Sequence, residues 1–219
     1  MPDPFAIKDC ALITMGTGER AQNLRELRDR LLTVDQACIY HHFWGNLLRP
    51  RFDDPEFQND FAAWAYHGLR ANRLAERLAL IDPCDYTDME QLRRELVEVI
   101  EQTLDESEFV PWAKVNQQFY FMLSHLVVFD TKMRPENPEM LRDLIPRFSV
   151  GSIYYHFIDA RQRSAIGKDD FSEWIIDFGE DYKPLAVRLA AIDPYFSPLT
   201  ELRREINDVV QTYTPKGGI

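Results

Sequence analysis

Cysteine is scarce in this sequence and lacks the spacing of a paired site. The three cysteines are Cys10, Cys38 and Cys84, and no Cys-x-x-Cys pair occurs. An odd number of widely spaced cysteines excludes a disulfide framework and fits a reducing compartment. The first residues lack the basic start and apolar run of a signal peptide, and the longest apolar stretch, 119–129, is about half of what spans a bilayer. We therefore predict a cytoplasmic protein with no membrane partner.

Positive charge is also in short supply. The chain has 25 lysines and arginines against 36 acidic residues, which gives a formal net charge of −11. Because such a surface repels phosphate backbones, the charge argues against a nucleic-acid partner. Two arginine-rich patches, 25–30 and 161–163, are interpreted as solvated helix faces or helix ends.

Specific catalytic and metal-binding motifs are missing as well. The sequence has no Glu-x-x-His pair of the di-iron bundles and no His-Glu-x-x-His zinc motif. His41 and His42 are adjacent on a predicted helix, so their side chains should diverge, and we predict no metal site. The segment 15–19 contains two glycines but lacks the rest of a phosphate loop and is interpreted as a turn. No cofactor can be named, and whether the chain is an enzyme stays open.

What the sequence does contain is an internal repeat. Residues 27–43 align without gaps on residues 141–157, and the block 74–83 aligns on 185–194, with Ile-Asp-Pro at the end of both copies. Further matches are Phe61 and Trp64 with Phe171 and Trp174, and Leu-Arg-Arg-Glu at 92–95 with 202–205. An ordered series of this kind predicts a tandem duplication.

The repeat predicts the domain boundaries. Carried backwards, the same offset of the first block places Phe5 on Phe119, Leu12 on Leu126 and Asn23 on Asn137. We predict a first helical repeat unit at 4–106, a linker at 107–117 and a second repeat unit at 118–214, each the size of a small domain.

Hydrophobic periodicity predicts a mainly α fold of about five helices per unit. In the first unit these lie near 23–32, 35–48, 55–68, 70–81 and 87–105. Asn23 with Glu26 and Asp170 with Glu173 have capping-box spacing, which indicates helix starts. The segments 119–129 and 11–15 are rich in β-branched and aromatic residues, and one strand alone cannot satisfy its backbone, so they are expected to pair as a short two-stranded ribbon.

The candidate ligand-binding residues come from the matched aromatic and histidine positions. They are Tyr40, His42, Trp64, Tyr154, His156 and Trp174. On a helix the two histidines share a face with apolar neighbours, where a neutral imidazole could act as acid, base or ligand. The alternative is a core histidine held by one buried partner. For the tryptophans the alternatives are core packing and an aromatic platform for a ligand.

Two carboxylates could serve these histidines. Asp82 and Asp193 stand before a proline at the end of the fourth predicted helix of each copy. They could orient the imidazoles as partners in acid–base chemistry, or they could be turn residues that accept hydrogen bonds from local amides. The pattern favours the turn.

Taken together, the Ile-Tyr-(His/Tyr)-His-Phe segments, the Phe-x-x-Trp pairs, the Ile-Asp-Pro blocks and the Leu-Arg-Arg-Glu ends resemble a bacterial domain-of-unknown-function family with tandem helical repeats. The resemblance implies the fold unit and no activity.

Two candidate functions remain for the chain. One is a non-enzymatic module that binds a small molecule or protein, or regulates one, with a groove between the repeats. The other is a small-molecule enzyme that uses the Tyr/His pairs for acid–base chemistry, with a bound metal as its less favoured form. The oligomeric state is not encoded in any motif.

Overall fold

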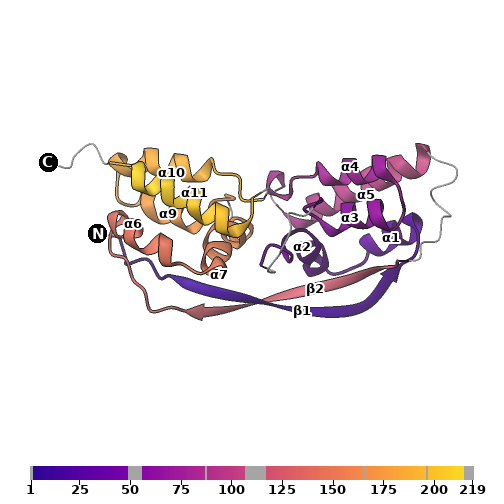
Figure 1. Ribbon diagram of the computed structural model, residues 1–219, viewed down its shortest axis with the longest axis horizontal. Coiled ribbons are helices and arrows are strands. Elements are labelled where there is room, and N and C mark those ends of the chain that lie inside the picture. The colour runs from indigo at the N-terminus through magenta and orange to yellow at the C-terminus, as the bar shows by residue number, and fades with distance from the viewer. Residues whose placement is uncertain are drawn as a thin grey trace. The chain divides into compact units, whose positions relative to one another are not determined.

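The computed structural model describes residues 2–48, 56–86, 88–106, 117–164, 166–195 and 197–214 (Figure 1). The chain divides into two compact units. Unit 1 combines residues 1–11 with 126–219, and unit 2 comprises residues 12–125. Each unit is described by itself below. No helix in the described ranges has the length and apolar character needed to cross a membrane.

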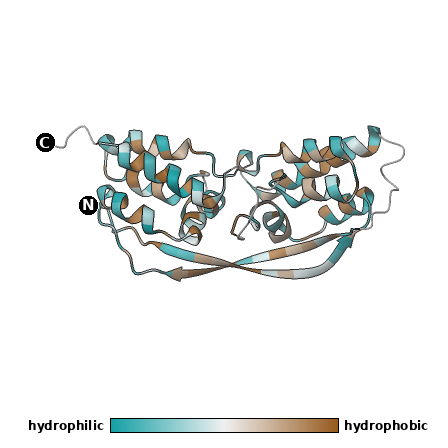
Figure 2. Cartoon of the chain, in the orientation of Figure 1, coloured by the Kyte–Doolittle hydropathy of each residue, from teal (hydrophilic) through white to brown (hydrophobic). Residues whose placement is uncertain are grey.

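The described residues of unit 2 form five α-helices, the number that the periodicity predicts. They are α1 (Leu24–Leu31), α2 (Gln36–Trp44), α3 (Asp60–His67), α4 (Asn72–Ala79) and α5 (Met89–Glu106). In Figure 2 hydrophobic and hydrophilic residues alternate along these helices, as expected where one face of each helix is buried. Leu27, Phe43, Phe61 and Leu96 have no exposed surface and form part of this core.

The α-helices of unit 1 follow in chain order, and the first three of them are shorter than those of unit 2. They are α6 (Leu141–Leu144), α7 (Val150–Ile153), α8 (Ala160–Arg163), α9 (Asp170–Ile176), α10 (Lys183–Ala190) and α11 (Leu199–Thr212). A π-helical segment at 154–159 joins α7 to α8, whereas α2 in unit 2 is a regular α-helix. Phe157, Phe171, Leu189 and Ile206 are fully buried in this unit.

Two strands, β1 (Lys8–Ala21) and β2 (Phe119–Asp130), pair as a two-stranded sheet. They run antiparallel (Figure 1), and the predicted ribbon is therefore confirmed. β1 is longer than predicted because it runs through 15–19, the segment expected to form a turn. Thr17 explains this difference, since its hydroxyl donates to the carbonyl of Phe121 at 2.7 Å and helps hold this part of β1 against β2.

In each unit the segment at the start of a strand packs on helices that come from the other half of the sequence. Residues 3–8 pack on the π-helical segment 154–159 and on α9 of unit 1, and residues 117–122 pack on α2 and α3 of unit 2. The structure thus groups the strands and helices differently from the repeat boundaries at 4–106 and 118–214, which remain a prediction about the sequence. The predicted linker lies outside the described residues except for Gln117.

The Leu-Arg-Arg-Glu blocks have a structural explanation. Arg93 is buried, and its guanidinium donates to the carbonyl of Leu31 at the end of α1 and to that of Val34, the latter at 2.9 Å. Arg203 donates in the same way to the carbonyl of Phe148 at 2.7 Å. These bonds satisfy carbonyl groups that a helix end or connecting turn would otherwise leave without partners.

The helix starts follow the predicted caps in part. Asn23 accepts a hydrogen bond from the Glu26 N–H, which is half of the predicted capping box. The Glu26 carboxylate accepts from the N–H of Gln22 and from the side-chain amide of Asn23, and not from the backbone N–H of Asn23 that a capping box requires. At α9 the cap is Asp169, which accepts from Ser172 N–H, and not Asp170 as predicted. The third helix begins at Asp60, with Asn59 as its cap, which is later than the predicted residue 55.

Candidate functional site

In each unit one histidine and one tryptophan hold an extended segment of the chain. We call this arrangement the strand clamp. Its helix residues are His42 and Trp64 in unit 2 and His156 and Trp174 in unit 1, four of the six predicted site residues. The segments that they hold are 117–122 and 3–8.

The histidine of each clamp binds the backbone at the start of a strand. Met122 N–H donates to Nε2 of His42 at 3.1 Å, and Lys8 N–H donates to Nε2 of His156 at 2.8 Å. Both histidines are buried, with 3% and 2% of their surface exposed. Because Nε2 accepts in each case, the neutral ring carries its proton on Nδ1.

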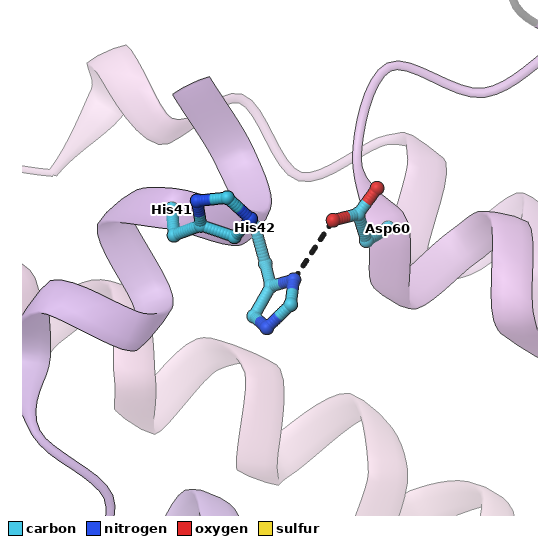
Figure 3. Close-up of side chains that lie close together, drawn as sticks. All are labelled: His41, His42 and Asp60. Atoms are coloured by element: carbon cyan, nitrogen blue, oxygen red, sulfur yellow. Dashed lines mark hydrogen bonds and ion pairs between the residues drawn. The ribbon is translucent and has the colours of Figure 1, made fainter. Parts of the chain in front are cut away.

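The second ring nitrogen is held by a carboxylate. Nδ1 of His42 lies 2.8 Å from Oδ2 of Asp60, and Nδ1 of His156 lies 2.7 Å from Oδ2 of Asp170 (Figure 3 for the first pair). These aspartates occupy the first turn of α3 and α9. Their positions at a helix N-terminus favour the negative charge.

The tryptophan of each clamp binds a backbone carbonyl five residues before the amide bound by histidine. Trp64 Nε1–H donates to the carbonyl of Gln117 at 2.7 Å, and Trp174 Nε1–H donates to that of Asp3 at 2.9 Å. Together the two side chains fix the direction and register of the segment, because one binds an acceptor and the other a donor.

A phenylalanine of the held segment fills the space between the clamp residues. Phe119 packs against His42, Phe61 and Trp64, with ring centroids 4.7, 5.2 and 5.7 Å away. Phe5 packs against His156, Phe171 and Trp174 at 4.9, 5.4 and 5.2 Å. Phe61 and Phe119 are stacked, and the other pairs are tilted or edge-on. Aromatic contacts of these kinds at these distances are favourable. Positions paired by the predicted repeat therefore make the same contacts.

The surroundings of the two carboxylates differ. In unit 2, Asn46 donates to the Asp60 carboxylate at 2.5 Å. Burial by itself would raise the pKa of Asp60, but the hydrogen bonds from His42 and Asn46 hold it below its ordinary value. In unit 1 the second partner of Asp170 is the Arg163 guanidinium, at 3.1 Å. Arg163 also contacts Asp159 at 2.7 Å and lies over the Tyr155 ring.

The two units also differ at one pair of matched residues, His41 in unit 2 and Tyr155 in unit 1. Nδ1 of His41 lies 2.6 Å from the hydroxyl of Ser124. In unit 1 the position matched to Ser124 is Cys10, whose thiol donates to the carbonyl of Gly151 at 3.2 Å. Burial, with the nearby Asp9 and Asp159 charges, raises the pKa of Cys10 to about 12, so this thiol stays protonated near neutral pH.

Among the described residues, His41, His42 and Asp60 could be considered as a metal site. Their donor atoms lie within 4.8 Å of one another (Figure 3), nearer than the adjacency of the histidines on a helix suggested. The rings meet edge to face at 5.0 Å, which offsets the divergence of their Cβ bonds. A metal on Nδ1 of His42 would move the ring proton to Nε2, where it would oppose the Met122 N–H. Metal binding there would break a hydrogen bond to the strand.

The remaining predicted residues lie apart from these contacts. Tyr40 stacks on Trp44 with ring centroids 5.2 Å apart, and Tyr154 is fully buried. Asp82 and Asp193 are turn residues that accept hydrogen bonds from the N–H groups of Cys84 and Tyr195, both at 2.8 Å. The carboxylate partners of the histidines, Asp60 and Asp170, were missed. The signal was present as Asp-Phe-x-x-Trp at 60–64 and 170–174, of which only Phe and Trp were matched.

The chain matches the family described as "Family of unknown function (DUF5752)" over residues 2–211. It belongs to this family. A search of curated proteins found no match. The fold is similar to that of "The structure of OrfY from Thermoproteus tenax", with a TM-score of 0.83 and 24% sequence identity over 100% of this chain and 99% of that chain. This likeness shows the fold and assigns no activity.

Proposed function

We propose that the chain is a non-enzymatic binding protein whose helical units hold extended peptide segments. The observation that carries the proposal is the repetition of one set of contacts in both units: Trp Nε1–H to a carbonyl, His Nε2 from an amide, and a Phe ring against both. Backbone hydrogen bonds of this kind give affinity for an extended chain, and pockets for alternate side chains give specificity.

The same contacts argue against acid–base chemistry at the histidines. In both clamps Nε2 accepts a backbone N–H and Nδ1 donates to a carboxylate. A general base must reach the proton that it abstracts, and these nitrogens are already engaged by the fold. We therefore do not propose an enzyme that uses the Tyr/His pairs.

The charge of the chain supports peptides over nucleic acids as partners. A net charge of −11 disfavours phosphate backbones and favours the approach of basic segments. The predicted groove between the two repeats remains a prediction, and the proposal does not depend on it.

The proposal is tested by incubating the immobilised full chain with an array of extended peptides of varied sequence. A chain with Trp64→Phe and Trp174→Phe is the matched control, because it keeps aromatic packing and removes both N–H donors. We expect a subset of peptides to bind the native chain and to lose most of their signal on the control. Equal binding to both chains, or no peptide bound, contradicts the proposal.

A further inference from the structure

The two held segments share a side-chain pattern that indicates what a clamp selects. Phe5 and Phe119 are followed two residues later by Ile7 and Phe121, which are buried with 0% and 1% of their surface exposed. Side chains two positions apart point to the same face of an extended chain. The residue between them, Tyr120 in unit 2, is 58% exposed. The two held segments therefore share the pattern Phe-x-bulky apolar.

The other contacts do not depend on sequence. The tryptophan binds a carbonyl and the histidine binds an amide, and these two groups recur in almost every residue. Any extended segment with Phe two residues after the bound carbonyl and three before the bound amide can form them. Residues 3–8 and 117–122 have this spacing and little other identity.

The clamp of unit 1 covers its occupant less completely. Phe119 in unit 2 is 4% exposed, whereas Phe5 in unit 1 is only half-buried. Less apolar surface removed from water means that Phe5 contributes less than Phe119 to the hold on its segment. Exchange of the occupant is therefore expected first at the clamp of His156 and Trp174. Backbone hydrogen bonds of Phe5 and Ile7 to residues 131–135 also hold this segment, and a replacing segment would have to form them again.

We propose that this clamp binds an extended segment of another protein, carrying Phe followed two residues later by Ile or Phe, in place of the chain's own residues 3–8. The inference rests on the proposed function and names its site and its partner class. The partner's Phe would take the position of Phe5, against His156, Phe171 and Trp174, and the apolar residue after it the buried position of Ile7.

The test uses a fluorescent peptide with the sequence of residues 2–9 and a second peptide in which its Phe is replaced by Ala. Binding to the full chain is followed by fluorescence anisotropy. We expect the first peptide to bind a Phe5→Ala chain about tenfold or more tightly than the native chain, because the native segment competes for the site. The Ala peptide should bind the Phe5→Ala chain about tenfold or more weakly.

The location of binding is tested with Trp174→Phe and its counterpart Trp64→Phe, each added to Phe5→Ala. Both variants keep an aromatic ring, and circular dichroism verifies that each is folded. Loss of binding with Trp174→Phe alone supports the inference. Equal affinity for the two peptides, or equal effects of the two tryptophan variants, overturns it.

A third arm separates this inference from the proposed function. Extended peptides without the Phe-x-apolar pattern are measured on the same chains. If they bind as well as the first peptide, and Trp174→Phe abolishes that binding, the selectivity is overturned and the proposed function stands. If no peptide binds any of the chains, both are overturned.

Discussion

The backbone N–H of Lys8 donates a hydrogen bond of 2.8 Å to Nε2 of His156, a residue 148 positions later in the chain. Met122 and His42 form the corresponding bond at 3.1 Å, across 80 positions in the opposite direction of the sequence. Each bond joins a strand that starts in one half of the sequence to helices from the other half. The position of each histidine ring is therefore fixed in part by the strand amide that it binds.

Removing either clamp histidine should destabilise the fold. In His156→Ala the amide of Lys8 loses its acceptor, and in His42→Ala the amide of Met122 loses its acceptor. In both variants the partner aspartate also loses one of its donors. We expect each change to lower the free energy of unfolding by about 1–3 kcal/mol, measured by urea denaturation. Exposed His67 and His125 provide controls, for which changes to Ala should stay within about 0.5 kcal/mol. Equal effects at all four positions would contradict the assigned contacts.

The two clamp phenylalanines should differ in their contribution. Phe119→Ala removes a ring that is 4% exposed and should cost about 3–5 kcal/mol of unfolding free energy. Phe5→Ala removes a half-buried ring and should cost less, because less apolar surface is lost. Chemical denaturation of both variants measures the difference. A larger cost for Phe5→Ala would show that unit 1 holds its segment more tightly than its burial indicates.

Gly151 is required for the approach of β1 to α7. A Cβ at this position would lie 2.2 Å from Oδ1 of Asp9 and 2.4 Å from the carbonyl of Cys10. Gly151→Ala should therefore displace the strand and cost about 1–3 kcal/mol. Gly16→Ala is the control, since its Cβ would meet only Met122 Sδ at ordinary contact distance, 3.8 Å. Thermal unfolding that ranks the two variants as equal would argue against close packing at Gly151.

Asp60 should contribute to the acid sensitivity of the fold. Its pKa is lower in the folded state than its ordinary value, so its contribution to stability is present above about pH 4 and is lost as the pH falls through the folded-state pKa. Asp60→Asn removes this titration and should flatten the acid side of a stability–pH profile from urea denaturation. The exposed Asp208→Asn should leave the profile unchanged. A native-like slope in Asp60→Asn would exclude this carboxylate as a source of the pH dependence.

The cysteines should differ in reactivity. Cys10 is buried and its pKa is raised to about 12, whereas Cys84 is partly exposed. Since the thiolate is the reactive form, we expect iodoacetamide at about pH 8 to modify Cys84 first and Cys10 only after denaturation. Peptide mapping by mass spectrometry identifies the modified residues. Rapid modification of native Cys10 would mean that unit 1 opens at β1.

Local patterns predicted much of the fold. The buried faces of the helices, the helix cap at Asn23 and the two strands follow from periodicity and side-chain type. The same reasoning placed His42, His156, Trp64 and Trp174 together as candidates. In each copy the histidine and the tryptophan lie close together in the sequence, so a local pattern can place them near each other.

The long-range relations could not be predicted in this way. Periodicity shows which face of a strand is buried but not which helices cover it, and the segment at 3–8 is covered by helices more than 140 residues later. A pattern based on 3.6 residues per turn also cannot predict the π-helical segment at 154–159. Asp170 was missed because its place at a predicted helix start already explained it as a cap. Asp60 was missed because the third helix was predicted to begin at residue 55, which placed this aspartate inside the helix.

The strand clamp is tested most directly by residue-specific amide hydrogen exchange of the native chain and of His156→Ala, in which the side chain offers no hydrogen-bond acceptor. The amides of Lys8 and Met122 should both be protected in the native chain. In His156→Ala we expect protection to fall at Lys8 and to remain at Met122, because Met122 is held by His42. Unchanged protection at Lys8, or equal loss at both amides, would contradict the clamp.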